Sequence, residues 1–165
     1  MFFSIFRAIE ATGLSVWIRE SDSVFSFWCI LSVHAIGMGV LVGASVLIGL
    51  RILGLAPDLP LAPLQRFYRF IWAGFWIQVV SGILLLIAYP TKSLTNPLFY
   101  IKLTLIGLAV ASMQMLRNRV FADSNLSEAA MMAKGRVIAV WSLIFWVAAI
   151  TAGRLLAYTY TVLTA

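Results

Sequence analysis

Acidic residues, histidine and cysteine are all scarce in this 165-residue chain. It has six Asp and Glu residues against twelve Lys and Arg, one histidine (His34) and one cysteine (Cys29). A single cysteine excludes an intrachain disulfide and a metal site built from several thiolates of one chain. All six acidic residues lie outside the long apolar segments, so no serine, histidine and carboxylate can converge there. Hydrolytic chemistry is therefore not indicated, and enzymatic activity stays open only as that of a membrane oxidoreductase.

Charge of either sign is also rare, because 11% of the residues are charged and 62% are hydrophobic. An average soluble domain carries about 25% charged residues. Four stretches, at about 24–50, 70–89, 97–116 and 137–157, are long enough to cross a hydrocarbon core of about 30 Å. Backbone groups in lipid must be satisfied within the segment, and none of the stretches alternates like a barrel strand. The predicted fold is all-α, a single domain with a four-helix transmembrane bundle.

The basic residues flank the apolar stretches instead of gathering on one polar element, so the net charge of +6 does not indicate nucleic-acid binding. The loops after the first and third spans hold Arg51, Arg66, Arg69, Arg117, Arg119, Lys134 and Arg136. The opposite side holds Arg7, Arg19 and Lys92. The positive-inside rule places the two loops in the cytoplasm and both termini outside, in a bacterial cytoplasmic (inner) membrane.

Residues 1–22 precede the first span as a separate arm. Apolar residues recur there at helical spacing, with charged residues such as Arg7 and Glu10 between them and a break at Gly13. These charges interrupt any signal-peptide core, so we expect the arm to be retained. The pattern predicts one or two short amphipathic helices lying in the outer membrane interface. An arm packed against a partner subunit is the alternative.

The third loop contains a helix start. Ser124 or Asn125 can cap a helix that passes through Glu128 and Lys134. We expect this helix to continue into the fourth span.

Small residues mark two predicted packing faces, because they let another backbone or a flat ligand approach closely. The first span contains the motif Gly39-x-x-x-Gly43. The second span carries one stripe made of Gly74, Gln78, Ser81 and Gly82.

Three ionisable residues, His34, Lys102 and Arg154, each lie inside a different span. Such groups are costly in a bilayer and therefore point to a site. At about 1.5 Å per helical residue, His34 lies roughly 15 Å below the outer boundary and Lys102 roughly 7 Å below it. By the same count Arg154 lies close to that boundary. One imidazole and two cations are thus expected in the outer half of the membrane.

A neutral imidazole is a good axial ligand for haem iron, and the porphyrin needs an apolar slot and cations for its propionates. We therefore predict haem b with His34 as the metal ligand and with Lys102 and Arg154 as propionate partners. Gly37 and Met38 lie one turn from His34, and Gln78 is the polar residue at mid-depth of the second span. The candidate cofactor-binding residues are His34, Lys102, Arg154, Gly37, Met38 and Gln78. Without a second histidine the iron is five-coordinate, or is completed by a partner chain or a second copy.

A purely structural role is the alternative for each of these residues. His34 can hydrogen-bond to Gln78 or Ser81, and such pairs in membrane helices average about 0.6 kcal/mol. Lys102 and Arg154 can extend their charged ends to the interface. The protein would then be a haem-free accessory subunit, or a homo-oligomer, that packs through its glycine-rich faces.

Five segments carry a family resemblance: IEATGLSVWIRES, SVHAIGMGVLVGASVLIGLRILGL, FIWAGFWIQVVSGILLL, NPLFYIKL and AGRLLAY. In this order they resemble a bacterial family of four-helix membrane proteins catalogued as a domain of unknown function. The resemblance covers nearly the whole chain and implies the fold without an activity.

A more distant resemblance rests on the His-x-x-Gly of the first span, the glycine-rich second span and a lysine early in the third. These features are similar to copper-resistance D-like proteins and to haem-binding membrane protoporphyrinogen oxidases. The latter resemblance implies a b-type haem on His34, with basic residues corresponding to Lys102 and Arg154. It implies a cytochrome b-like protein that transfers electrons or a haem-carrying subunit of a membrane complex. This chain departs from that family in having no other histidine.

Overall fold

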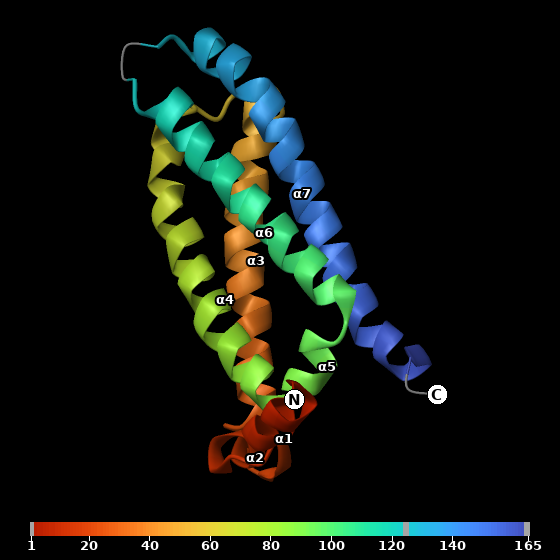
Figure 1. Ribbon diagram of the computed structural model, residues 1–165. Coiled ribbons are helices and arrows are strands. Elements are labelled where there is room, and N and C mark those ends of the chain that lie inside the picture. The colour runs from red at the N-terminus through yellow and green to blue at the C-terminus, as the bar shows by residue number, and fades with distance from the viewer. Residues whose placement is uncertain (1, 124–125, 164–165) are drawn as a thin grey trace.

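The computed structural model describes residues 2–123 and 126–163. The elements are α1 (Phe2–Glu10), α2 (Gly13–Glu20), α3 (Phe27–Ile52), the 3-10 helix η1 (Ala62–Phe67), α4 (Tyr68–Ala88), α5 (Pro90–Leu94), α6 (Pro97–Leu116), the π-helical turn η2 (Arg117–Phe121) and α7 (Glu128–Leu163). The described residues form helices and no strands, which confirms the all-α prediction. Figure 1 shows their arrangement.

Four helical segments are long and apolar enough to cross a membrane, as predicted. They correspond to α3, to η1 with α4, to α6 with η2, and to α7 up to Thr159. The predicted third span, 97–116, has the same bounds as α6, and the first two agree with α3 and α4 to within three residues. The predicted fourth span, 137–157, lies within α7, which has 36 residues. At about 1.5 Å per residue α7 measures about 54 Å, which exceeds a hydrocarbon core of about 30 Å.

The long helices form an open bundle. α3 packs against α4 and α7, and α6 packs against α7. We call the end with residues 53–61 and 122–127 the loop end, and the end with α1, α2, α5 and the last turns of α7 the terminal end. Figure 1 shows α4 and α6 separating from the loop end toward the terminal end. This separation creates room between the helices in the terminal half.

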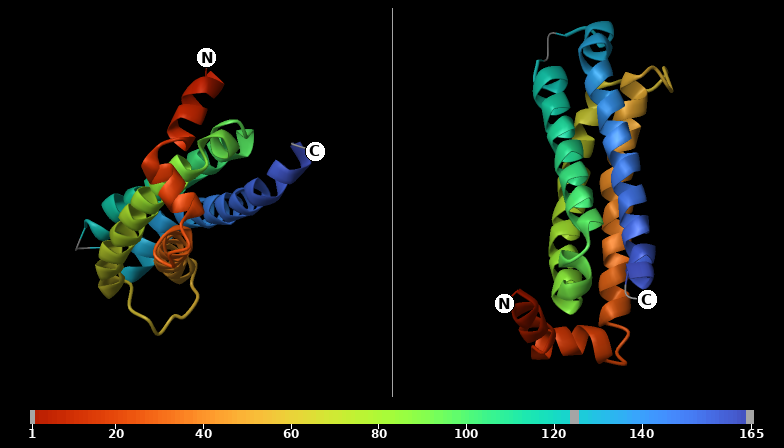
Figure 2. Two further views of the ribbon diagram at one scale, coloured as in Figure 1. Left: turned by 90° about the horizontal axis from the view of Figure 1, so that it is seen from below. Right: turned by 45° about the vertical axis from the view of Figure 1, so that its right-hand side comes forward.

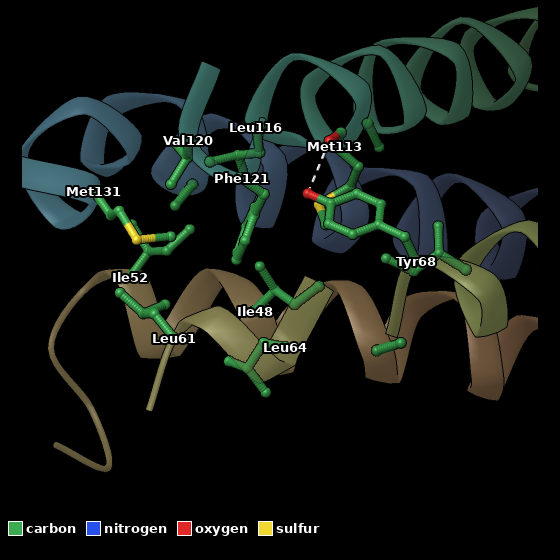
Figure 3. Close-up of a cluster of buried hydrophobic side chains, with 14 of the residues drawn as sticks. Ile48, Ile52, Leu61, Leu64, Tyr68, Met113, Leu116, Val120, Phe121 and Met131 are labelled. Carbon is green, nitrogen blue, oxygen red and sulfur yellow. Dashed lines mark hydrogen bonds between the residues drawn. The ribbon is translucent and has the colours of Figure 1, made fainter. Parts of the chain in front are cut away.

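Much of the buried core lies at the loop end (Figure 3). Its buried side chains include Ile48, Ile52, Leu61, Leu64, Tyr68, Met113, Leu116, Val120, Phe121 and Met131. The Tyr68 hydroxyl donates to the backbone oxygen of Met113 at 3.0 Å. The Tyr68 ring meets the edge of the Phe121 ring, with centroids 5.7 Å apart. α4 is thereby fastened to the α6 side of the bundle at this end.

A buried cation closes the loop end. The side chain of Arg51, at the end of α3, is 4% exposed and forms an ion pair with Glu128 at the start of α7. Its guanidinium also donates to the backbone oxygens of Pro57, at 3.2 Å, and Leu59. A buried charge needs such partners to offset its lost hydration. Arg51 therefore joins the first loop to α7.

The start of α7 lies in the third loop, as predicted. The predicted caps Ser124 and Asn125 lie outside the described residues. The helix begins at Glu128 and continues without a break through the fourth span. The Ser127 hydroxyl accepts a hydrogen bond from the backbone nitrogen of Ala130 at 3.4 Å, so Ser127 caps the first turn.

The arm lies across the terminal end (Figure 2). Its two helices meet at the predicted break, where Gly13 begins α2. Ser15 and Arg19 of α2 donate to the backbone oxygen of Ala88 at 3.5 and 3.4 Å. The Glu10 carboxylate accepts from the backbone nitrogen of Thr91 at 3.3 Å. These bonds hold the arm against the junction of α4 and α5.

α3 and α4 cross at two glycines. A Cβ atom added to Gly74 would lie 2.8 Å from the backbone nitrogen of Leu41 and 2.9 Å from the backbone oxygen of Gly37. A Cβ added to Gly37 would collide with the Ile77 side chain. Since the atoms facing Gly74 are largely backbone, they cannot move aside independently. The crossing therefore requires glycine at position 74.

We expect Gly74→Ala to lower the free energy of unfolding by about 1–3 kcal/mol, the usual cost of overpacking. Gly39→Ala is the matched control on α3, because a Cβ there meets no atom within 4 Å. Unfolding in mixed micelles, followed by circular dichroism, measures the difference. Equal stability of the two variants would contradict this account of the crossing.

Candidate functional site

A pocket of about 490 Å³ lies between the long helices in the terminal half of the bundle. Its volume falls in the range of about 300–1,000 Å³ that is typical of small-molecule sites. Leu41, Phe75 and Trp146 line it, and they also pack with the hydrophobic core. The pocket follows from the helix arrangement, because Tyr68 joins the helices at the loop end and α4 and α6 then diverge.

His34 lines this pocket from α3. Its Nδ1 lies 2.8 Å from the Ser81 hydroxyl oxygen, and that hydroxyl donates to the backbone oxygen of Ile77 at 2.5 Å. A hydroxyl has one hydrogen, so the Ser81 oxygen accepts from the Nδ1–H group. This assigns the neutral tautomer that carries its lone pair on Nε2. Among the described residues, Nε2 has no hydrogen-bond partner.

The second span holds the imidazole in place. Gln78 donates from its side-chain nitrogen to the backbone oxygen of His34 at 2.5 Å. A Cβ added to Gly82 would lie 3.5 Å from His34 Cε1, so the glycine leaves room for the ring edge. Together with Ser81 and Gly74, these contacts confirm the predicted packing stripe on α4.

The hydrogen bond to Ser81 matches the structural alternative for His34, but it occupies only Nδ1. Histidines that bind metals usually donate their other ring N–H group to a second residue, which fixes the tautomer and the ring orientation. The packing contact and an available Nε2 therefore coexist in one side chain. The arrangement suits His34 to donate a lone pair to a ligand in the pocket.

Lys102 lines the same pocket from α6. Its aliphatic stem passes close to Gly153 of α7, where an added Cβ would lie 3.5 Å from Cε and 3.8 Å from Nζ. Within residues 2–123 and 126–163, no hydrogen bond or ion pair engages the ammonium group. The pocket lining contains no acidic residue in this part of the chain. Its electrostatics therefore favour a ligand with an anionic group.

Two more candidates from the sequence, Met38 and Gln78, also line the pocket. Two others do not. Gly37 is buried in the crossing of α3 and α4. Arg154 is exposed on α7 and is absent from the pocket wall. The structure thus brings His34, Met38, Gln78 and Lys102 together and leaves Arg154 outside.

Sequence reasoning missed most of the apolar wall. Phe99, Ile83, Leu103 and Trp146 line the pocket without having been singled out. A membrane span carries apolar side chains toward lipid and toward its interior alike, so hydropathy offers no signal for these residues. The indole nitrogen of Trp146 is buried and has no hydrogen-bond partner among the described residues.

The fold and the pocket define a class: a protein with four helices long and apolar enough to span a membrane, and a ligand-sized pocket in one half of the bundle. Comparisons with protein-family models, curated proteins and solved structures found no match.

His34 is the sole histidine, so labelling the protein with ¹⁵N-histidine reports on this one ring. At mildly alkaline pH and without ligand, we expect the nitrogen spectrum to show a protonated Nδ1 and an unprotonated Nε2. Ser81→Ala removes the acceptor and should shift the ring toward the Nε2–H tautomer. Ser112→Ala is the control, because Ser112 donates to Leu108 on α6 in the same way but does not contact His34. An Nε2–H tautomer in the unmodified protein would contradict the assignment.

Proposed function

We propose that this protein binds haem b in the terminal half of its bundle. It acts as a small cytochrome b-like electron-transfer protein, or as the haem-carrying subunit of a membrane complex. The observation that carries the proposal is the His34 ring, which Ser81 engages through Nδ1. Its Nε2 is thereby left as a ligand for iron at the wall of an apolar pocket.

The residues present suit this group. Haem iron takes one or two axial ligands from the protein, and a neutral imidazole is among the commonest. When bound, haem supplies one-electron redox chemistry. His34 would hold the iron, Lys102 would neutralise a propionate, and the apolar wall would exclude water. Arg154 is exposed and outside the pocket wall, so the propionate role falls to Lys102.

The described part of the chain places no second iron ligand opposite His34 in the pocket. Met38 lines the pocket, but it lies one turn from His34 on the same helix and cannot reach the opposite face of the same iron. A bound haem iron would then take its further ligand, if any, from a partner chain or a second copy. The distant resemblance to haem-binding membrane proteins supports the haem proposal through sequence motifs only.

The proposed location is a bacterial cytoplasmic membrane with the terminal end outside. Seven of the twelve basic residues lie in the helix ends that flank the two loops at the loop end, which supports a cytoplasmic position for that end. Phe3, Ile5, Leu14 and Trp17 of the arm are each about half exposed, as is typical of helices in a membrane interface. The apolar outer faces of the long helices support contact with the lipid bilayer.

One observation favours a second candidate function, that of an accessory subunit. Gly39 and Gly43 of α3 are exposed, and an added Cβ at either position meets no atom within 4 Å. The chain therefore does not use this Gly-x-x-x-Gly face for its own packing. Such faces favour close association with another helix, from a second copy or from another subunit.

The absorption spectrum tests the haem proposal. Protein produced with adequate haem supply should show a Soret band and, after reduction with dithionite, the sharp visible bands of a b-type haem. His34→Ala should abolish the bound haem, because it removes the proposed iron ligand. Arg154→Gln should retain it, because Arg154 lies outside the pocket wall. Purified protein without a Soret band would rule out the proposal.

Lys102→Gln tests the propionate role. We expect haem affinity to fall about tenfold, equivalent to about 1.4 kcal/mol, because one charge-assisted contact is lost. Titration with haem and with its dimethyl ester gives the measurement. The ester should bind the unmodified protein and Lys102→Gln with similar affinity. A similar loss for acid and ester would show that Lys102 acts by packing.

A further inference from the structure

We infer that the pocket is loaded sideways from the membrane, through an opening between α4 and α6, so its ligand is an amphiphile dissolved in the bilayer. The inference rests on the proposed function, because it concerns how the same pocket is filled. Its substrate class is a largely apolar molecule with one acidic end.

The rim of this lateral opening consists of Ile83 on α4, and Leu103 and Gly107 on α6. Ile83 and Leu103 line the pocket and are also 51% and 50% exposed, so each side chain borders both the pocket and the outer surface. Gly107, one turn further from the helix start, is exposed and lines the pocket. A Cβ added there meets no atom within 4 Å. The gap between α4 and α6 therefore continues from Ile83 and Leu103 to the level of Gly107.

The depth of the rim places it in the hydrocarbon. Ile83 lies five residues before the end of α4 at Ala88, and Leu103 lies six residues after the start of α6 at Pro97. At about 1.5 Å per residue these separations correspond to about 8 and 9 Å. The two residues thus lie at matching levels below the terminal end. In a bilayer this level is occupied by acyl chains.

The terminal end of the pocket is covered. α5 connects α4 to α6 there, and its Ser93 lines the pocket. α1 packs against α5 from the other side. The hydrogen bonds of Glu10 to Thr91 and of Arg19 to Ala88 hold the arm in this position. At this end the pocket is therefore bordered by α5, with the arm packed against α5 and α4.

The inner end of the pocket is also closed, because Leu41 and Trp146 belong to the packed core. Ile150 of α7 also lines the pocket and is 39% exposed, but α7 packs against both α3 and α6. The gap between α4 and α6 is flanked on both helices by exposed lining residues, which favours the sideways route. This route also matches the polarity of the site. Lys102 lies about 7 Å from the start of α6, nearer the terminal end than the core-facing wall. An amphiphile with its acid at the interface already has the orientation that Lys102 would bind.

The experiment measures how fast haem moves from donor vesicles to the haem-free protein in acceptor vesicles, followed by the growth of the Soret band. Ile83→Trp and Leu103→Trp narrow the lateral opening. We expect them to slow loading by about tenfold or more, equivalent to a barrier increase of about 1.4 kcal/mol, with the final absorbance retained. Val80→Trp and Ile101→Trp are matched controls on the same helices. Both positions are similarly exposed, at 59% and 50%, and lie outside the pocket wall.

Leu103→Ala widens the opening and should accelerate loading. If the tryptophan variants lose bound haem, the loading rate of Leu103→Ala tests the lateral route instead. Faster loading of this variant supports the lateral route, and an unchanged rate overturns it. Arg19→Ala loosens the arm and should leave the rate unchanged, whereas faster loading would show that the ligand passes through the covered end. Narrowed variants that load at the control rate would overturn the lateral route and leave haem binding intact. An unmodified protein that never forms a Soret band would overturn haem binding itself.

Discussion

The close crossing of α3 and α4 at Gly37 and Gly74 is the constraint on which the site depends. Within a bilayer, apolar side chains gain little by leaving lipid, so helix association relies on close packing and on hydrogen bonds between helices. The crossing supplies the close packing, and the residues one and two turns beyond Gly74 supply the hydrogen bonds between helices. Gln78 reaches the backbone of His34 and Ser81 reaches its ring. The orientation of the imidazole thus depends on the close helix contact that glycine permits at positions 37 and 74.

The loop end of the bundle holds the contacts that fasten the helices together, and the terminal half holds the pocket. At the loop end, Tyr68 joins α4 to α6, and Arg51 joins the first loop to α7. With that end fixed, α4 and α6 diverge toward the other end, and the divergence leaves room for the pocket and for the lateral opening that we infer. The arm lies across the terminal end. The angle between α4 and α6 thus accounts for the place of the pocket, and the hydrogen bonds to Ala88 and Thr91 account for the place of the arm.

Much of the fold could be predicted from the sequence, because hydropathy and segment length report directly on whether a helix crosses a bilayer. The apolar stretch alone gives only the central part of the fourth helix. Its polar first turns, with Glu128 and Lys134, were predicted from the capping residues of the third loop. The packing stripe on α4 was also predictable, because small and polar residues at helical spacing rarely face lipid. The side of α7 on which Arg154 lies could not be predicted. Counting residues along a helix gives the depth of a residue in the membrane, whereas the side on which it lies depends on how α7 is rotated against its neighbours. For the same reason Gly37 was taken as a ligand contact, although it serves the helix crossing.

The central claim is that His34 presents Nε2 to a metal cofactor in the pocket. Electron–nuclear double resonance on the haem-loaded, oxidised protein labelled with ¹⁵N-histidine tests it most directly, because the chain has one histidine and any labelled nitrogen signal must come from it. The account predicts a strong coupling from one ¹⁵N nucleus to the iron, and its loss in His34→Ala. Bound haem without coupling to a labelled nitrogen would contradict the assignment of His34 as the iron ligand.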